Sequence, residues 1–203
     1  MAIRNIRLDG DDILRKTCRS VTKMDDRTLT LIDDMFDTMY EANGVGLAAP
    51  QIGENYRVFV IDVSTGNEPL NPMVFINPKI IKKSGAVISH EGCLSFPEAF
   101  TDVRRYANVM IKALDRNGRS FVLEAKDGTL LARAIQHEFD HLDGILFIDH
   151  VINRFEAEEV LKKHNLPDIQ VDKILDEPEL AAQIEVLLKE KVENEKSENI
   201  EKE

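Results

Sequence analysis

The spacing of apolar residues predicts a first helix near the start of the chain. Over residues 27–42, apolar side chains recur at intervals of three and four, which is the period of one face of an α-helix. Acidic and hydroxyl residues at 25–28 suit its N-terminal cap, and the pair Asn43–Gly44 suits its end. The two glycines and the proline of residues 44–51, GVGLAAPQ, then predict an irregular loop.

A second helix is predicted from Thr129, as its cap, to about Leu142, just before Asp143–Gly144. We expect it to be buried in the middle of the fold, because it is apolar at Leu130, Leu131, Ala134, Ile135 and Leu142. Two further helices are predicted at residues 154–164 and from residue 179 to about residue 192. The charged residues 193–203 predict an unstructured tail.

Residues with β-branched and aromatic side chains gather between the helices and predict short strands. The predicted strands are residues 56–63, 73–76, 79–81, 86–89, 103–114 and 119–125. The pair Asn117–Gly118 predicts a tight hairpin turn between the last two. Because strands and helices occupy separate stretches, we predict an α+β fold, in which short antiparallel or mixed sheets pack around a central metal-binding helix and further helices lie at both ends.

Composition narrows the class of protein. With 203 residues, 43% hydrophobic and 31% charged, the chain can form one globular domain whose core needs no metal, so any metal is expected to be functional. Two cysteines are too few for a disulfide framework and indicate a reducing cytoplasm, and Cys18 is expected to be a structural or surface thiol. No apolar segment has the length of a signal-peptide core or of a membrane span.

The net charge argues against binding to phosphate backbones. The formal value is −11 for the whole chain. Residues 151–203 hold 15 acidic and 8 basic side chains, a net of −7, which leaves −4 for residues 1–150. Since no basic patch in the sequence overrides this field, neither nucleic acid nor a membrane is an expected direct partner.

The strongest chemical signal is the segment His137-Glu138-Phe139-Asp140-His141 on the second helix. Histidines four residues apart lie on one helical face and can bind one metal ion, with Glu138 beside them for hydrolysis. A third protein ligand is still required. A metzincin would carry a histidine where Phe147 stands, and a thermolysin-like enzyme would use a glutamate at 156, 158 or 159. The glutamates remain possible on spacing alone, and the other candidate is Cys93.

Cys93 stands in Glu91-Gly92-Cys93-Leu94-Ser95, where the glycine lets the backbone approach an ion closely. Its thiolate and two imidazoles would make a three-ligand site with room for water. The small residues of the segment 44–51 suit a wall against which a peptide lies, and the side-chain amide of Gln51 suits an oxyanion donor.

Together these three segments resemble the motifs of the peptide deformylase family. The family's glycine-rich, Glu-Gly-Cys and Gln-His-Glu segments are matched, in order, by residues 44–51, 91–95 and 136–141. The resemblance extends over about residues 1–150, and the short interval between Gln51 and Cys93 is similar to that of the shorter, type 1-like bacterial subclass. It implies a catalytic domain over residues 1–166, followed by an acidic helical extension with a disordered tail over residues 167–203.

The resemblance also implies a role for each matched residue. Cys93, His137 and His141 would hold the metal, and Glu138 would take a proton from the attacking water and deliver one to the departing amine. The side-chain amide of Gln51 and the backbone N–H of Leu94 would stabilise the oxyanion. The positions that line the methionine pocket or pair with the peptide would be Val45, Gly46, Glu91, Leu94 and the helix face near His137.

By this resemblance the protein is a hydrolase that removes the formyl group from the N-terminal formylmethionine of new polypeptides and releases formate. The metal of such enzymes is typically ferrous iron, for which zinc, nickel or cobalt can substitute, and the ligand set alone accepts iron and zinc alike. We expect a cytoplasmic monomer that acts on nascent peptides, with at most transient proximity to the ribosome. A zincin-type endopeptidase and a binding module with a structural metal, or none, are the competing interpretations.

Two features depart from the family pattern. Phe100 and Thr101 occupy a stretch in which some relatives carry an arginine that holds the peptide. Arg104 or Arg105 would either replace that arginine or pair with Glu91. The C-terminal extension is acidic, whereas some bacterial relatives dock on the ribosome through a basic C-terminal helix, so that docking mode is not expected here.

Overall fold

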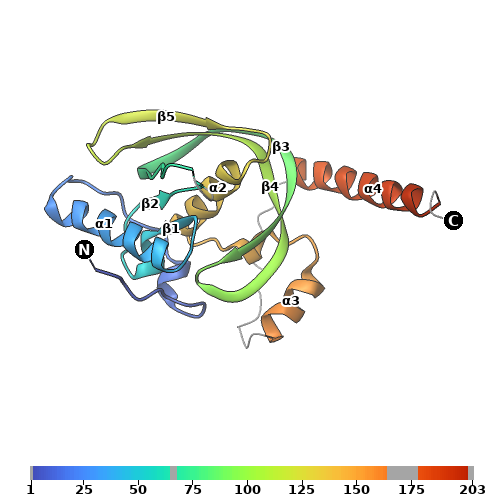
Figure 1. Ribbon diagram of the computed structural model, residues 1–203, viewed down its shortest axis with the longest axis horizontal. Coiled ribbons are helices and arrows are strands. Elements are labelled where there is room, and N and C mark those ends of the chain that lie inside the picture. The colour runs from blue at the N-terminus through green and yellow to red at the C-terminus, as the bar shows by residue number, and fades with distance from the viewer. Residues whose placement is uncertain (1, 65–67, 164–177, 201–203) are drawn as a thin grey trace.

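In the part of the chain that the structure describes, one curved sheet surrounds a central helix (Figure 1). The computed structural model describes residues 2–64, 68–163 and 178–200. The helices are α1 (Asp26–Glu41), α2 (Leu130–Leu142), α3 (Arg154–Lys163) and α4 (Pro178–Ile200). The strands are β1 (Gly46–Ala48), β2 (Val58–Ile61), β3 (Met73–Cys93), β4 (Phe96–Leu114) and β5 (Ser120–Ala125). Short 3-10 turns lie at Asp12–Arg15, Ala49–Ile52 and Phe147–His150.

The strands form a 5-stranded sheet in the order β1-β2-β3-β4-β5, and every pair is antiparallel. This confirms the α+β fold and selects the antiparallel alternative. The predicted limits of several strands are corrected, because residues 73–93 form one long strand and β4 begins at Phe96. Pro78 and Gly85 interrupt the sequence pattern, but a register shift between Ile76 and Lys79 accommodates the proline, and the pairing keeps one register on both sides of Gly85.

Helix α2 runs through the middle of the molecule, as predicted, and packs against β1, β2 and β4 (Figure 1). Its buried apolar residues are Ala132, Ala134, Ile135 and Leu142. The side chain of Thr129 accepts a hydrogen bond from the backbone N–H of Ala132 and closes the first turn. At the other end, the N–H of Ile145 donates to the carbonyl of Asp140, and Gly144 takes the φ of 71° that this ending requires.

Helix α1 leads the chain into the loop that precedes β1. Asp25 caps its first turn by accepting a hydrogen bond from the backbone N–H of Thr28 at 3.0 Å. Its buried apolar face packs into a cluster with β1 and β2 and contains Leu31, Ile32, Met35 and Met39. A Cβ added at Gly44 would lie 2.8 Å from the side chain of Leu94. The segment 44–51 is therefore held close to the turn that follows β3.

The C-terminal helix is longer than predicted. Helix α4 continues to Ile200 instead of ending near residue 192, so residues 193–200, which were predicted to be unstructured, are helical. The glutamates and lysines of this stretch are good helix formers, and this propensity explains why a charged segment is helical here. The predicted domain boundary after residue 166 lies outside the described residues.

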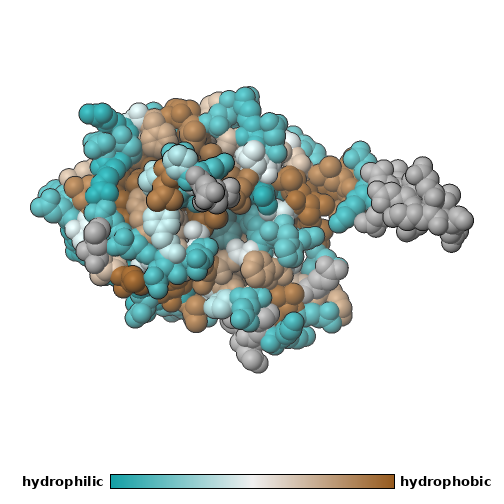
Figure 2. All heavy atoms as spheres, viewed as in Figure 1, coloured by the Kyte–Doolittle hydropathy of each residue, from teal (hydrophilic) through white to brown (hydrophobic). Residues whose placement is uncertain are grey.

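The first turns of α4 attach it to the sheet. Leu180 and Ile184 are buried, and α4 contacts β3 and β4 before it projects from the body (Figure 1). Figure 2 shows hydrophobic side chains where the helix leaves the body. Val186 of α4 is 53% exposed. Among the described residues, every helix is too short or too polar to cross a lipid bilayer.

We predict that Gly144→Ala destabilises the protein much more than Gly10→Ala does. Both glycines have positive φ, so alanine is strained at either position by about 1 kcal/mol. At Gly144 the added Cβ would also lie 2.5 Å from the backbone carbonyl oxygen of Arg15, whereas at Gly10 it would meet nothing within 4 Å. Urea unfolding should show a loss at Gly144 at least about 2 kcal/mol larger. Equal losses would mean that the end of α2 adapts freely.

Candidate metal centre and active site

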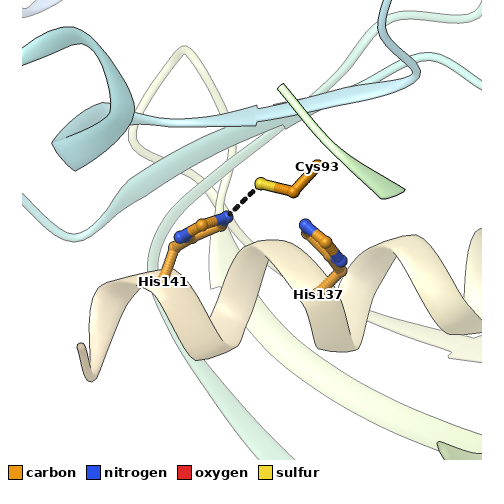
Figure 3. Close-up of side chains that lie close together, drawn as sticks. All are labelled: Cys93, His137 and His141. Atoms are coloured by element: carbon orange, nitrogen blue, oxygen red, sulfur yellow. Dashed lines mark hydrogen bonds between the residues drawn. The ribbon is translucent and has the colours of Figure 1, made fainter. Parts of the chain in front are cut away.

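Three side chains from distant parts of the sequence converge on one face of α2. Cys93 is the last residue of β3, and His137 and His141 lie one turn apart on α2 (Figure 3). One ligand atom from each residue lies within 4.8 Å of the other two. The Sγ of Cys93 is 3.3 Å from Nε2 of His141. The structure thus brings together the three residues that were predicted to hold a metal.

The local path of β3 explains how Cys93 reaches this position. Pairing with β4 is continuous up to Gly92 opposite Phe100, and a register shift then brings Cys93 opposite Phe96. A Cβ at Gly92 would overlap the ring of Phe100, so a larger residue would have to displace that exposed ring. The backbone N–H of Ser95 donates to the sulfur at 3.4 Å. Cys93 therefore enters the site from the hairpin end, facing α2.

Glu91 orients the first histidine. Its Oε2 lies 3.1 Å from Nδ1 of His137, which leaves Nε2 of that ring for the centre. Arg105 donates to the same carboxylate through Nε at 3.0 Å and Nη2 at 2.8 Å. Burial alone would raise the pKa of Glu91, but the Arg105 guanidinium and His137 outweigh burial and hold it well below its usual range. Glu91 therefore stays ionised beside the histidine.

The same arginine also reaches α2. The Nη1 of Arg105 donates to Oδ2 of Asp140 at 2.5 Å, and the arginine is only 2% exposed. The second neighbour of Asp140 is His150, whose Nε2 lies 3.0 Å from the same oxygen. Burial disfavours the charge on Asp140, but His150 and Arg105 lower its pKa to about 2. Arg105 was expected either to hold the peptide or to pair with Glu91. The structure supports the pairing, since its three nitrogens donate to Glu91 and Asp140.

His141 is buried in the neutral form that binds metals. It is 1% exposed, and burial together with the charge of His137 holds its pKa well below the usual range. Burial opposes the charge on His137 as well, but hydrogen bonding to Cys93 and Glu91 raises its pKa. A cation bound at this centre would displace the proton that His137 and Cys93 attract.

Gln51 presents the donor end of its amide to the centre. Its Oε1 accepts a hydrogen bond from the backbone N–H of Ala48 at 2.8 Å, which fixes the orientation of the amide group. Its Nε2 then faces Ser95 Oγ at 3.3 Å and Cys93 Sγ at 3.4 Å. Because Gln51 is 1% exposed, this N–H₂ group is held in place before any substrate arrives.

Glu138 packs against the backbone of Gly46. A Cβ added to Gly46 would overlap the Glu138 carboxyl group, with Cγ and Cδ at 2.9 Å, so only glycine allows this approach. The Oε2 of Glu138 is buried without a hydrogen-bond partner among the described residues. Burial raises the pKa of Glu138 to about 7, although the nearby His137 acts in the opposite direction. This carboxyl group can therefore exchange a proton near neutral pH.

A cavity of about 510 Å³ opens onto the centre. Its lining includes the four residues predicted to contact substrate, which are Val45, Gly46, Glu91 and Leu94. It also includes the N-terminal half of α2, with Leu130, Arg133 and Ala134, and the exposed ring of Phe100. Arg104 and Arg105 are not part of this lining. The sequence analysis missed Arg133, whose spacing of four residues before His137 could have placed it on the same helical face.

Among the described side chains, no alternative third ligand joins the centre. Phe147 packs its ring against that of His137, with centroids 5.9 Å apart. Glu158 and Glu159 do not belong to the group of potential ligands found among the described residues, and the side chain of Glu156 lies outside them. The endopeptidase interpretation therefore has no third ligand in the described structure.

The chemistry of the donors fits a divalent transition metal. One thiolate and two imidazoles are ligands that zinc and iron both accept, and three protein ligands leave a coordination position for a reactant. The carboxylate of Glu91 behind His137 is the usual partner of a histidine that binds metal through its other nitrogen. The residues present thus suit a catalytic rather than a purely structural ion.

Comparison with known proteins agrees with this geometry. The family model for polypeptide deformylase matches residues 3–157. Peptide deformylase 1 of Clostridium perfringens is 55% identical over 150 residues, which cover 74% of this chain and 99% of that protein. The deformylase of Acetivibrio thermocellus is 50% identical over 163 residues, or 80% of this chain and 92% of that protein.

Solved structures show the same likeness. The peptide deformylase of Synechococcus elongatus, crystallised in complex with actinonin, is 41% identical with a TM-score of 0.77, and the match covers 85% of this chain and 90% of that one. The peptide deformylase of Thermotoga maritima is 40% identical with a TM-score of 0.70, over 75% of this chain and 100% of that one. The chain therefore belongs to the peptide deformylase family, the metal-dependent hydrolases that remove the formyl group from the N-terminal formylmethionine of new polypeptides.

Proposed function

We propose that Cys93, His137 and His141 hold the catalytic metal ion of this deformylase, and that Glu138 and Gln51 act directly on the reacting groups. One observation carries the proposal: three ligand atoms lie within 4.8 Å of one another, next to a buried carboxyl group and an amide of fixed orientation. These parts come from three segments of the chain, since His137, Glu138 and His141 lie on α2, Cys93 ends β3 and Gln51 lies in the turn Ala49–Ile52.

We propose ferrous iron as the native ion, with zinc, nickel or cobalt able to replace it. The support is a ligand set of one soft sulfur and two imidazole nitrogens, which accepts all of these ions. When bound, the ion supplies Lewis acidity, which activates water and polarises the formyl oxygen. Cys93, His137 and His141 would hold it, and Glu91 would keep the ring of His137 in the ligating orientation.

Glu138 is the proton carrier of the proposed reaction. Its buried carboxyl group has a pKa raised to about 7 and an oxygen without a partner, so it is ready to accept a proton. It takes the proton of the attacking water as the oxygen adds to the formyl carbon. The same proton then passes to the nitrogen of the departing methionine as the C–N bond breaks, which releases formate.

Gln51 and Leu94 stabilise the negative charge that develops on the formyl oxygen. The N–H₂ group of Gln51 points to the centre because its oxygen is held by Ala48. Leu94 is the next residue after the proposed ligand Cys93, so its backbone N–H belongs to the peptide group that joins the two residues. Donors that are oriented before the reaction lose little free energy to reorganisation as the charge appears.

We propose that the substrate lies in the cavity with its backbone along residues 44–46 and β3 and its first side chain between Leu94 and α2. Val45, Gly46, Glu91 and Leu94 line this space, which supports their predicted roles. The protein would meet nascent peptides by diffusion as a cytoplasmic monomer. Helix α4 carries six glutamates against three lysines, a charge that disfavours docking on ribosomal RNA.

Cys93→Ala should abolish metal retention and deformylase activity together, because the centre loses its only sulfur ligand. Cys18→Ala is the matched control, since that thiol is buried in the core, and burial raises its pKa to about 11. Metal analysis after anaerobic purification and a formate assay on a formyl-Met tripeptide measure both effects. An alanine variant at residue 93 with a full complement of metal would contradict the proposed ligand set.

Glu138→Gln should keep the metal and lose turnover by about 10²- to 10⁴-fold, because the amide fills the same space but carries no exchangeable carboxyl proton. The control is Glu159→Gln, an exposed residue of α3 that should leave both metal content and turnover unchanged. The formate assay across pH 5 to 9 is the measurement. Turnover within about twofold of the native rate would remove Glu138 from the mechanism.

Gln51→Leu should lower kcat by about 100-fold with little change in KM, as expected for the loss of one oxyanion donor. Ser95→Ala removes a neighbour of the Gln51 amide but leaves its anchor at Ala48 intact, so its effect should be much smaller. Steady-state kinetics on formyl-Met peptides separates the two constants. A change confined to KM would show that Gln51 binds the substrate instead.

A further inference from the structure

Arg133 lines the cavity but has no role in the reaction proposed above. It lies on α2 one turn before His137 and lines the same cavity. Residues four apart on a helix share one face, so Arg133, His137 and His141 form a continuous row. The cavity includes the first two of these residues but not His141, which means that it extends from the centre toward the start of α2.

The guanidinium of Arg133 has few partners. Its Nη1 donates to Ser89 Oγ at 2.8 Å, and this is its one hydrogen bond within the described residues. Its Nε is fully buried and has no acceptor there. No carboxylate of the described chain forms an ion pair with it. A buried donor without an acceptor destabilises a protein, so this arrangement suits a group that a ligand or water completes.

The contrast with Arg105 shows that the structure can satisfy a buried arginine fully. Arg105 contacts two carboxylates, those of Glu91 and Asp140, with each of its three nitrogens engaged. Glu91 also lines the cavity, but its oxygens are taken by Arg105 and His137. The donors of Arg133 are therefore the ones that remain available on this wall.

The position of Arg133 matches the end of the first side chain of the substrate. Four residues of helix place its Cα about 6 Å from that of His137 along the axis. From the formyl carbon of a bound peptide, five bonds lead to the sulfur of methionine, a distance of about 6 Å in an extended chain. A side chain that runs along α2 from the metal centre would bring its sulfur to the helical turn that carries Arg133.

We propose that Arg133 is a specificity-determining residue that lets the enzyme deformylate chains whose first methionine is oxidised to the sulfoxide. The proposal rests on the proposed function, since it uses the same cavity and the same reaction. The thioether sulfur of methionine is a weak acceptor, whereas the sulfoxide group is polar and its oxygen accepts strong hydrogen bonds. An apolar pocket would reject it, because its oxygen would lose water without gaining a donor.

The remainder of the wall fits the other parts of that side chain. Leu94, Leu130 and Ala134 offer apolar contacts for its methylene groups. The sulfoxide is chiral at sulfur, and Ser89 holds one end of the guanidinium in a fixed place. Because a fixed donor meets only one of the two oxygen positions well, the enzyme should prefer one epimer over the other.

The test compares kcat/KM for formyl tripeptides that differ only in their first residue: methionine, norleucine and each separated sulfoxide epimer. The native enzyme should hydrolyse the better sulfoxide epimer at a rate within about tenfold of norleucine. In Arg133→Met, which keeps an unbranched apolar stem but has no donor, the ratio of that epimer to norleucine should fall at least about tenfold, as expected for a lost charge-assisted hydrogen bond. The preference between epimers should disappear as well.

Two further variants serve as controls. Arg133→Lys retains a donor and should recover part of the sulfoxide ratio, and Arg119→Met, which removes an exposed surface arginine, should leave the ratio as in the native enzyme. If Arg133→Met keeps the native ratio and epimer preference, the proposal for Arg133 is wrong. Normal turnover of the norleucine peptide in that variant would still support the deformylase function. Failure of the native enzyme to hydrolyse any of the formyl peptides would instead refute the proposed function.

Discussion

The buried guanidinium of Arg105 connects β4 to strand β3 and helix α2, which carry the proposed metal ligands. From β4 it binds Glu91 of β3 and Asp140 of α2. A buried charge is tolerated only when its partners stay within reach, so these three elements cannot separate without a large loss of free energy. Glu91 in turn fixes the ring of His137. The spacing between the cysteine and the histidines therefore depends on an ion cluster that lies outside the reacting groups.

Charge compensation distinguishes the groups that build the site from those that act in it. The Arg105 guanidinium lies between the carboxylates of Glu91 and Asp140, and together with His137 and His150 it holds the pKa values of both carboxyl groups low. Glu138 and Arg133 have buried atoms without partners, and both line the cavity. Unsatisfied polar groups are unfavourable in a resting protein, and at a cavity wall they are the groups that a substrate can complete.

Local patterns predicted the helices well and the strands less well. Thr129 and Gly144 mark the two ends of α2, since a cap and a left-handed residue act within a single turn. The sequence pattern predicts several short strands where β3 is one long strand, because Pro78 and Gly85 interrupt the period of two that marks a strand. Whether such residues end a strand or form a bulge depends on the pairing of the neighbouring strand, which local sequence does not contain.

The sequence by itself indicated the family and the proposed ligands, because His137 and His141 are joined by helix geometry and the motif around Cys93 carries its own glycine. It also indicated Gln51 and Glu138, whose roles follow from neighbours close in the chain. Only the tertiary structure decided how these groups are held and which donors stay free. The pairing of a carboxylate with one arginine rather than another depends on distances between residues far apart in sequence, and those distances exist only once β3, β4 and α2 have packed together.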